Sequence, residues 1–151
     1  FKAMRISSKG RYALAAMITM SERYNSGEYT TVISISEKLG ISKIYLEQVF
    51  SLLKRGGIVT STKGAQGGYR LARHPRHISV FDVLSSIESA LFEPTAETVE
   101  TKAPESEAAL RSAVFDVLDE AVKNTLTQIS LYDLVNEAEK HLSDNHLMFF
   151  I

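Results

Sequence analysis

Residues 34–50 contain the pattern that decides the fold, and they read SISEKLGISKIYLEQVF. Ile35 and Leu39 stand four residues apart, which predicts a short helix with one apolar face, and Gly40 supplies a turn after it. Ser42 is placed to cap a second helix. The buried stripe of that helix is predicted to contain Leu46, Val49, Phe50 and Leu53. Two short helices joined at a glycine are typical of a helix-turn-helix, whose second helix fits the major groove of DNA.

A glycine-rich hairpin is predicted directly after these two helices. Gly56-Gly57 ends the second helix, and strand-like runs over 58–63 and 69–72 flank the sequence GAQGG at 64–68. A basic hairpin in this position is the wing of a winged helix-turn-helix. The expected fold class is therefore mainly α with a small β wing, extended by a long dimerisation helix.

Capping residues and helical spacing predict the other elements. In chain order these are a helix over 8–24, a short strand over 29–32, a helix capped by Ser79, a long helix over 106–126 and a last helix over 130–142. The stretch 93–107 is rich in Pro, Thr and Glu, which predicts a mobile loop. The expected domains are a winged helix-turn-helix over 4–90, a flexible loop over 91–105, and a dimerisation helix, last helix and apolar tail over 106–151.

The net charge of -1 conceals two oppositely charged halves. Residues 1–78 contain 13 Lys and Arg against 4 Asp and Glu, a balance of +9, whereas residues 79–151 contain 4 against 14, a balance of -10. A basic half joined to an acidic half indicates a module that binds a polyanion, attached to a part that does not.

Several classes of protein are excluded by composition. The chain has no cysteine, which rules out disulfides, cysteine-bound zinc, cysteine-ligated iron–sulfur clusters and thiol chemistry. The longest apolar run, 12–18, is too short to span a bilayer, and no secretion signal is recognisable, so a cytoplasmic location is expected. Phe1–Ala3 is interpreted as a remnant of cloning ahead of a natural start at Met4.

The second helix of the helix-turn-helix and the wing hold the residue types that read DNA. Gln48 can pair with adenine through two hydrogen bonds, Glu47 can accept from cytosine, and Lys63 can enter a narrow minor groove. Basic residues near the start of the chain are expected to bind phosphates. The predicted DNA contacts are Arg5, Lys9, Arg11, Ser42, Lys43, Tyr45, Glu47, Gln48, Lys63, Gly64 and Gln66.

Each of these residues also has an interpretation without DNA. Lys43 and Glu47 are four residues apart and can pair on a solvated helix face. Tyr45 can be a partly buried aromatic of the core, and Gly67-Gly68 can serve a tight turn alone.

Three ordered stretches resemble the Rrf2 family of bacterial transcription regulators: MRISSKGRYA at 4–13, IYLEQ at 44–48 and KGAQGGY at 63–69. The resemblance covers essentially the whole chain from Met4. It implies a homodimer held by the long helix, in which each subunit applies one recognition helix and one wing to half of a palindromic operator. By position, it assigns the recognition-helix motif to Tyr45, Glu47 and Gln48 and the basic wing position to Lys63.

One departure from the family concerns cofactors. Family members that bind an iron–sulfur cluster carry three cysteines in the loop corresponding to about 92–107, and this loop has none. The chain therefore resembles the cluster-free branch, which represses genes of cysteine metabolism, and no cofactor is expected. No metal site is expected either, because no metal-ligand spacing is matched by His74, His77, His141 and His146.

The long helix over 106–126 has an apolar surface too broad for packing on one side of a small domain. It is predicted to form a subunit interface through Leu110, Val114, Val117, Leu118, Ala121 and Val122. The alternative is an internal helix of the monomer.

The chain ends on the apolar stretch Leu147–Ile151, which is expected to be buried within the subunit or across the dimer. The resemblance implies a second hypothesis, because the tail is similar to that of the cluster-free branch, whose partner is cysteine synthase. That enzyme accepts a C-terminal isoleucine carboxylate from its usual partner. On this hypothesis cysteine synthase is bound by Met148, Phe149, Phe150 and Ile151.

Three other functions are alternatives to a DNA-binding repressor. Catalysis is not expected, because the GAQGG loop joins two strands rather than a strand and a helix, and no lysine within it precedes Ser or Thr. A protein-interaction module without DNA is disfavoured by the basic half. A cluster-free regulator of the same family that responds to another small molecule or partner stays open.

Overall fold

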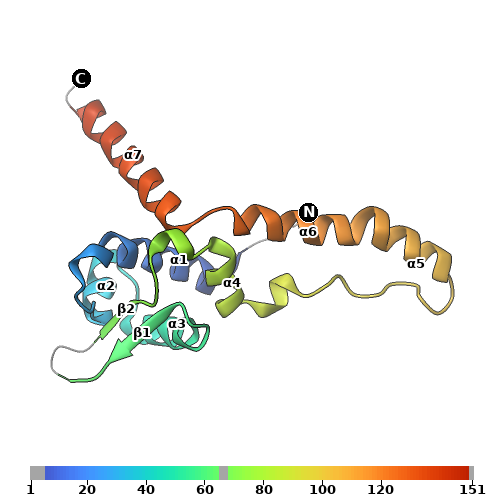
Figure 1. Cartoon of the computed structure of the whole chain (residues 1–151), viewed down its shortest axis with the longest axis horizontal. Helices are drawn as coiled ribbons and strands as arrows, with labels where there is room; N and C mark the ends of the chain where they lie inside the picture. Colours follow the sequence, from blue (N-terminus) through green and yellow to red (C-terminus); the bar gives the residue numbers. More distant parts are fainter. Residues whose placement is uncertain (1–5, 65–67, 150–151) are drawn as a thin grey trace.

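The structure is a computed structural model that describes residues 6–64 and 68–149. Within these ranges seven α-helices and a two-stranded sheet follow one another along the chain (Figure 1). The helices are α1 (Ser8–Glu22), α2 (Val32–Leu39), α3 (Lys43–Arg55), α4 (Val80–Ile87), α5 (Pro104–Leu110), α6 (Asp116–Thr127) and α7 (Leu131–Phe149), and the strands are β1 (Val59–Thr62) and β2 (Gly68–Leu71). This confirms the predicted fold class, mainly helical with a small wing.

Helices α2 and α3 form the predicted helix-turn-helix. Thr31 and Ser42 cap their first turns by accepting hydrogen bonds from the N–H groups of Ser34 and Tyr45. Gly40 has a φ of 68°, a left-handed conformation that ends α2 and turns the chain toward α3. The predicted function of Gly40 as the turn residue is therefore confirmed.

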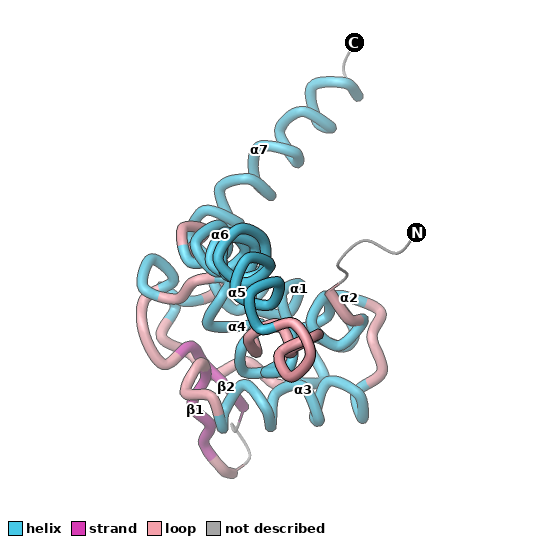
Figure 2. Tube along the Cα trace, turned by 90° about the vertical axis from the view of Figure 1, so that its right-hand side faces the viewer, coloured by secondary structure: helices cyan, strands magenta, loops and turns pink. Residues whose placement is uncertain are grey.

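The core lies between α1, α2, α3 and α4 and the inner face of the sheet, as Figure 2 shows from the end of the molecule. The predicted stripe of α3 is buried completely, with no exposed area at Leu46, Val49, Phe50 and Leu53. Against it pack apolar side chains of the neighbouring elements, among them Ala13, Ala16, Met17, Ile35, Ile58, Ile78 and Val83.

Strands β1 and β2 form an antiparallel hairpin in which Val59 pairs with Leu71. The strand predicted over 29–32 is wrong except at Thr30, which exchanges backbone hydrogen bonds with Tyr69 at 2.7 and 2.8 Å. Because Thr31 caps α2, the chain becomes helical at Val32 and cannot continue along the sheet.

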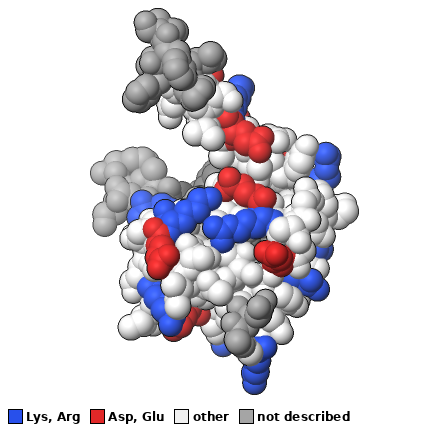
Figure 3. All heavy atoms as spheres, turned by 90° about the vertical axis from the view of Figure 1, so that its left-hand side faces the viewer, with Lys and Arg blue, Asp and Glu red and all other residues white. Residues whose placement is uncertain are grey.

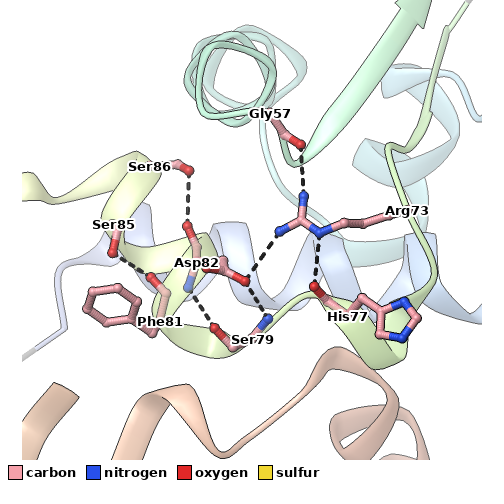
Figure 4. A network of polar contacts seen from close by, with 8 residues as sticks. All are labelled: Gly57, Arg73, His77, Ser79, Phe81, Asp82, Ser85 and Ser86. Carbon is pink, nitrogen blue, oxygen red and sulfur yellow. Dashed lines mark hydrogen bonds and ion pairs between the residues drawn. The ribbon is translucent and has the colours of Figure 1, made fainter. Parts of the chain in front are cut away.

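A polar network ties the end of the wing to the helical core (Figure 4). The guanidinium of Arg73 donates to the carbonyls of His77 and Gly57, at 2.9 and 3.2 Å, and to the Asp82 carboxylate at 3.3 Å. Asp82 also accepts the N–H of Ser79, which completes the cap of α4. One arginine therefore holds together the exits of α3 and β2 and the start of α4.

The long helix begins at Pro104, two residues before the predicted start, because proline is well suited to the first turn of a helix. A π-helical turn over Arg111–Phe115 joins α5 to α6. The preceding loop runs back along these helices (Figure 1). Hydrogen bonds attach Thr95 of this loop to Asp119 of α6, while the mobility predicted for the loop stays a prediction.

Helix α7 starts where predicted, with Ser130 as its cap, but it continues to Phe149 instead of ending near residue 142. The sequence 131–149 contains no glycine or proline that would stop it. Its first turn is anchored by the buried Leu131, and its second half projects away from the helical core (Figures 1 and 2). None of the described helices is long and apolar enough to cross a lipid bilayer.

Candidate nucleic-acid interface

Helix α3 presents a fixed polar face to solvent. Its four buried residues hold the helix against the core, so that Lys43, Glu47 and Gln48 lie on the exposed side. The N-terminal turn, capped by Ser42, still has free backbone N–H groups and the positive end of the helix dipole. These features together suit a negatively charged ligand with hydrogen-bonding edges.

Lys43 and Glu47 form an ion pair at 3.6 Å, with both side chains about half exposed. This is the ion pair that the spacing of the two residues predicts as the alternative to contact with DNA. Exposed pairs of this kind contribute little to stability and break readily, so both groups remain available to a ligand.

Tyr45 is half-buried. Its ring meets that of Tyr12 edge to face, with the ring centres 5.3 Å apart, and it lies against the core. The alternative interpretation of Tyr45 as a partly buried aromatic is therefore confirmed. Its contact with DNA stays a prediction. The same pair of rings positions α1 next to the start of α3.

Ile44 is the residue on α3 that sequence reasoning missed. Its side chain is 71% exposed, on the same helix face as Glu47 and Gln48, which follow it by three and four residues. The sequence feature that indicates this exposed residue is an isoleucine outside the apolar stripe of the helix.

The wing lies on the same side of the molecule as α3, away from α7, in both views of the backbone (Figures 1 and 2). A ring contact of 4.7 Å between Phe50 and Tyr69 joins β2 to α3. Lys63 and Gly64, at the start of the hairpin tip, are exposed, and Gly64 has a φ of 113°. Gln66, also predicted to contact DNA, lies outside the described residues.

Two of the three predicted phosphate contacts near the N-terminus can be placed. Lys9 is half-buried on α1, and Arg11 is exposed, where its guanidinium donates to the hydroxyl of Ser8 at 3.0 Å. Arg5 lies outside the described residues. Figure 3 shows basic side chains spread over the winged-helix body on one face, with acidic side chains among them.

The predicted dimer stripe is largely uncovered in the protomer. Val114, Val117 and Leu118 are 48%, 59% and 53% exposed, Ala121 is exposed, and Leu110 and Val122 are half-buried. The opposite side of α6 packs on α4. The stripe is therefore an apolar surface without a partner in the described part of the protomer.

The loop before α5, together with α5 and α6, forms an acidic region. Hydrogen bonds from the backbone and side chain of Thr95 lower the pKa of Asp119 below its usual range. A hydrogen bond and the charge of Glu97 raise the pKa of Glu100. The carboxylate of Glu107 is buried, and one of its oxygens accepts the N–H of Thr98.

The described residues contain no metal site, because nowhere among them do three His, Asp or Glu side chains come together as ligands. His74 accepts the N–H of Arg76 through its Nδ1 at 3.0 Å, and His141 pairs with Glu137 at 3.3 Å. The predicted partner-binding tail cannot be placed, because Phe150, Ile151 and the side chains of Met148 and Phe149 lie outside the described residues.

Comparison with known proteins relates the chain to transcription regulators. Residues 6–137 match the family Rrf2, described as iron-dependent transcriptional regulator. IscR of Klebsiella pneumoniae (strain 342), an HTH-type transcriptional regulator, is 35% identical over 136 residues, which are 90% of this chain and 82% of the relative.

Two solved structures share the fold over nearly the whole chain. T. potens IscR has a TM-score of 0.70 at 30% identity, covering 92% of this chain and 91% of its own. CymR of B. subtilis, described as the global cysteine regulator, has a TM-score of 0.73 at 32% identity, covering 89% of this chain and 98% of its own.

The iron of the family description does not fit this chain as a cysteine-ligated cluster. Such clusters need thiolates, and the chain contains no cysteine. This region of the chain contains carboxylates, such as that of Glu107 on α5, but no three of the described His, Asp or Glu side chains come together as ligands. With these relatives, this chain is a transcription regulator rather than an enzyme, and it belongs to the Rrf2 family.

Proposed function

We propose that this protein represses transcription by binding palindromic operator DNA through α3 and the wing. The observation that carries the proposal is the division of α3 into two faces: Leu46 and Phe50 are fully buried, while Gln48 is exposed. The buried face fixes the backbone of α3, so that a side chain on the opposite face can meet a base edge when the helix lies in the major groove.

The proposal includes a homodimer held by the apolar stripe of α5 and α6. A two-fold axis through this stripe buries the same side chains of both copies, including Val117 and Leu118. Two α3 helices related by that axis then address two half-sites, which requires a palindrome. Repression follows where such a site overlaps a promoter.

A salt titration of DNA binding tests the proposal. Genome-wide capture with the purified protein identifies an operator, which is then made as a synthetic duplex. Fluorescence anisotropy measures the affinity of the protein for this duplex at salt concentrations from about 50 to about 200 mM. Affinity is expected to fall about 10³-fold if about six phosphates are neutralised, because counterions are released from DNA. Weak binding that is indifferent to salt supports a protein-interaction module instead.

A second part of the proposal concerns regulation in the cytoplasm. Similarity to CymR of B. subtilis, together with the lack of cysteines, favours control of cysteine metabolism without a cluster. The partner proposed on this basis is cysteine synthase, bound by the C-terminal residues Met148–Ile151.

Removal of Ile151 alone tests the partner. Loss of co-purification with cysteine synthase, while operator binding is unchanged, is the expected result. Unchanged co-purification refutes the tail as the anchor. Operator binding that responds to a different small molecule, and not to the enzyme, supports the alternative of a cluster-free regulator with another effector.

A further inference from the structure

Ile44 is the most exposed of the described large apolar side chains, at 71%. A single exposed apolar residue is common on protein surfaces and by itself carries no conclusion. The position of this one is more informative. It lies in the first turn of α3, and its helix face is shared with Glu47 and Gln48.

The first turn of a recognition helix is the part that reaches base edges in the major groove. The base edges present donors and acceptors there, and one apolar group, the 5-methyl of thymine. Glu47 and Gln48 match donors and acceptors, whereas the hydrocarbon of Ile44 matches the methyl group alone. This face of α3 thus contains one apolar and two polar side chains, and each has a chemically suitable counterpart on the base edges.

The local structure also holds Ile44 ready for such a contact. Leu46 on the buried side has no exposed area, so α3 cannot rotate to cover Ile44. A β-branched side chain in a helix has one strongly preferred χ1 rotamer, so the two branches of Ile44 point in a defined direction. Little side-chain entropy is therefore lost when a methyl group packs against it.

We propose that Ile44 determines specificity by packing against the 5-methyl group of a thymine in each half-site, next to the base pair that Gln48 contacts. The inference rests on the proposed function, because it needs α3 in the major groove. It predicts a preference for thymine over both cytosine and uracil at one position of each half-site. A residue at position 44 that is too short to reach the methyl group removes this preference.

Selection from a randomised duplex library supplies the probe, and the selected duplex is then made with deoxyuridine in place of each thymine in turn. Deoxyuridine lacks only the 5-methyl group. The wild-type protein is expected to lose about fourfold in affinity at one position per half-site, as burial of one methyl group implies. The Ile44→Ala variant is expected to bind the thymine and uracil duplexes about equally.

Ile33 provides a matched control, because it is also exposed, at 50%, but lies on α2. The Ile33→Ala variant is expected to keep the full thymine preference. Circular dichroism checks that both variants fold. An undiminished uracil effect in Ile44→Ala, or no uracil effect in the wild type, overturns the inference while sequence-specific binding stands. Failure of the wild type to select any duplex overturns the proposed function and this inference together.

Discussion

Substitution of Val117 by aspartate is the most direct perturbation of the proposed dimer. Val117 lies in the middle of the exposed stripe on α6, between Val114 and Ala121. A carboxylate there cannot be buried against an apolar partner without a large loss of hydration free energy. Because the interface is two-fold symmetric, each dimer receives the change twice.

The size of the effect follows from the exposure of the side chain. Burial of a whole valine contributes about 1.5 kcal/mol, and 59% of this one remains accessible in the protomer, so about 1 kcal/mol is gained per copy on association. Two copies contribute about 2 kcal/mol, which corresponds to a dimer dissociation constant raised about 30-fold. Repulsion between the two carboxylates adds to this minimum.

Sedimentation equilibrium measures the dissociation constant, and anisotropy with a palindromic duplex measures the effect on DNA binding. Ser112→Asp is the matched control, since Ser112 is exposed and outside the stripe. It adds the same charge and is expected to leave the dimer unchanged. A Val117→Asp dimer within about threefold of wild type, an effect too small for the lost burial, refutes the assignment of the interface.

Three further predictions concern the reading face, the wing and the acidic loop. Gln48→Ala should cost about 1–3 kcal/mol of operator affinity and relax the preference at one base pair, as measured by anisotropy with single-base variants. Gly68→Ala should lower the unfolding free energy by about 3 kcal/mol in urea titrations, because a Cβ would clash with the Thr30 carbonyl oxygen and side chains rarely adopt the φ of +154° found here. A loss below about 0.5 kcal/mol contradicts that reasoning. Because the pKa of Asp119 is lowered in the folded protein, its hydrogen bonds to Thr95 stabilise the fold at any pH above the usual pKa range of an aspartate. This stabilisation is lost as the pH falls through the pKa that Asp119 has in the folded protein. The stability difference between wild type and Asp119→Asn should therefore be present at pH 7 and shrink in acid, and a difference that grows in acid contradicts it.

The helix-turn-helix could be predicted from the sequence because its signals are local. Ser42 caps a helix with its own neighbours, and a glycine such as Gly40 adopts the left-handed turn without strain. The spacing of Leu46, Val49 and Leu53 defines one face before any partner is known. Interactions within a few residues thus determined the elements, and with them the polar face that includes Gln48.

Contacts between distant parts of the chain could not be read in this way. Thr30 joins the wing because Tyr69 arrives beside it, and Tyr45 is half-buried because α1 brings Tyr12 against it. The loop before α5 looked free in sequence, yet Asp119 lies where Thr95 can bond to it. Each of these outcomes depends on the packing of elements far apart in sequence.

The sequence by itself determined the winged helix-turn-helix, the opposite charges of the two halves and the exclusion of a cysteine-ligated cluster, since these follow from residue type and local spacing. Only the tertiary structure decided that the stripe around Val117 stays uncovered in the protomer and that Tyr12 lies against Tyr45. The physical reason is that exposure depends on which other element covers a side chain, and this choice is made when the helices pack together.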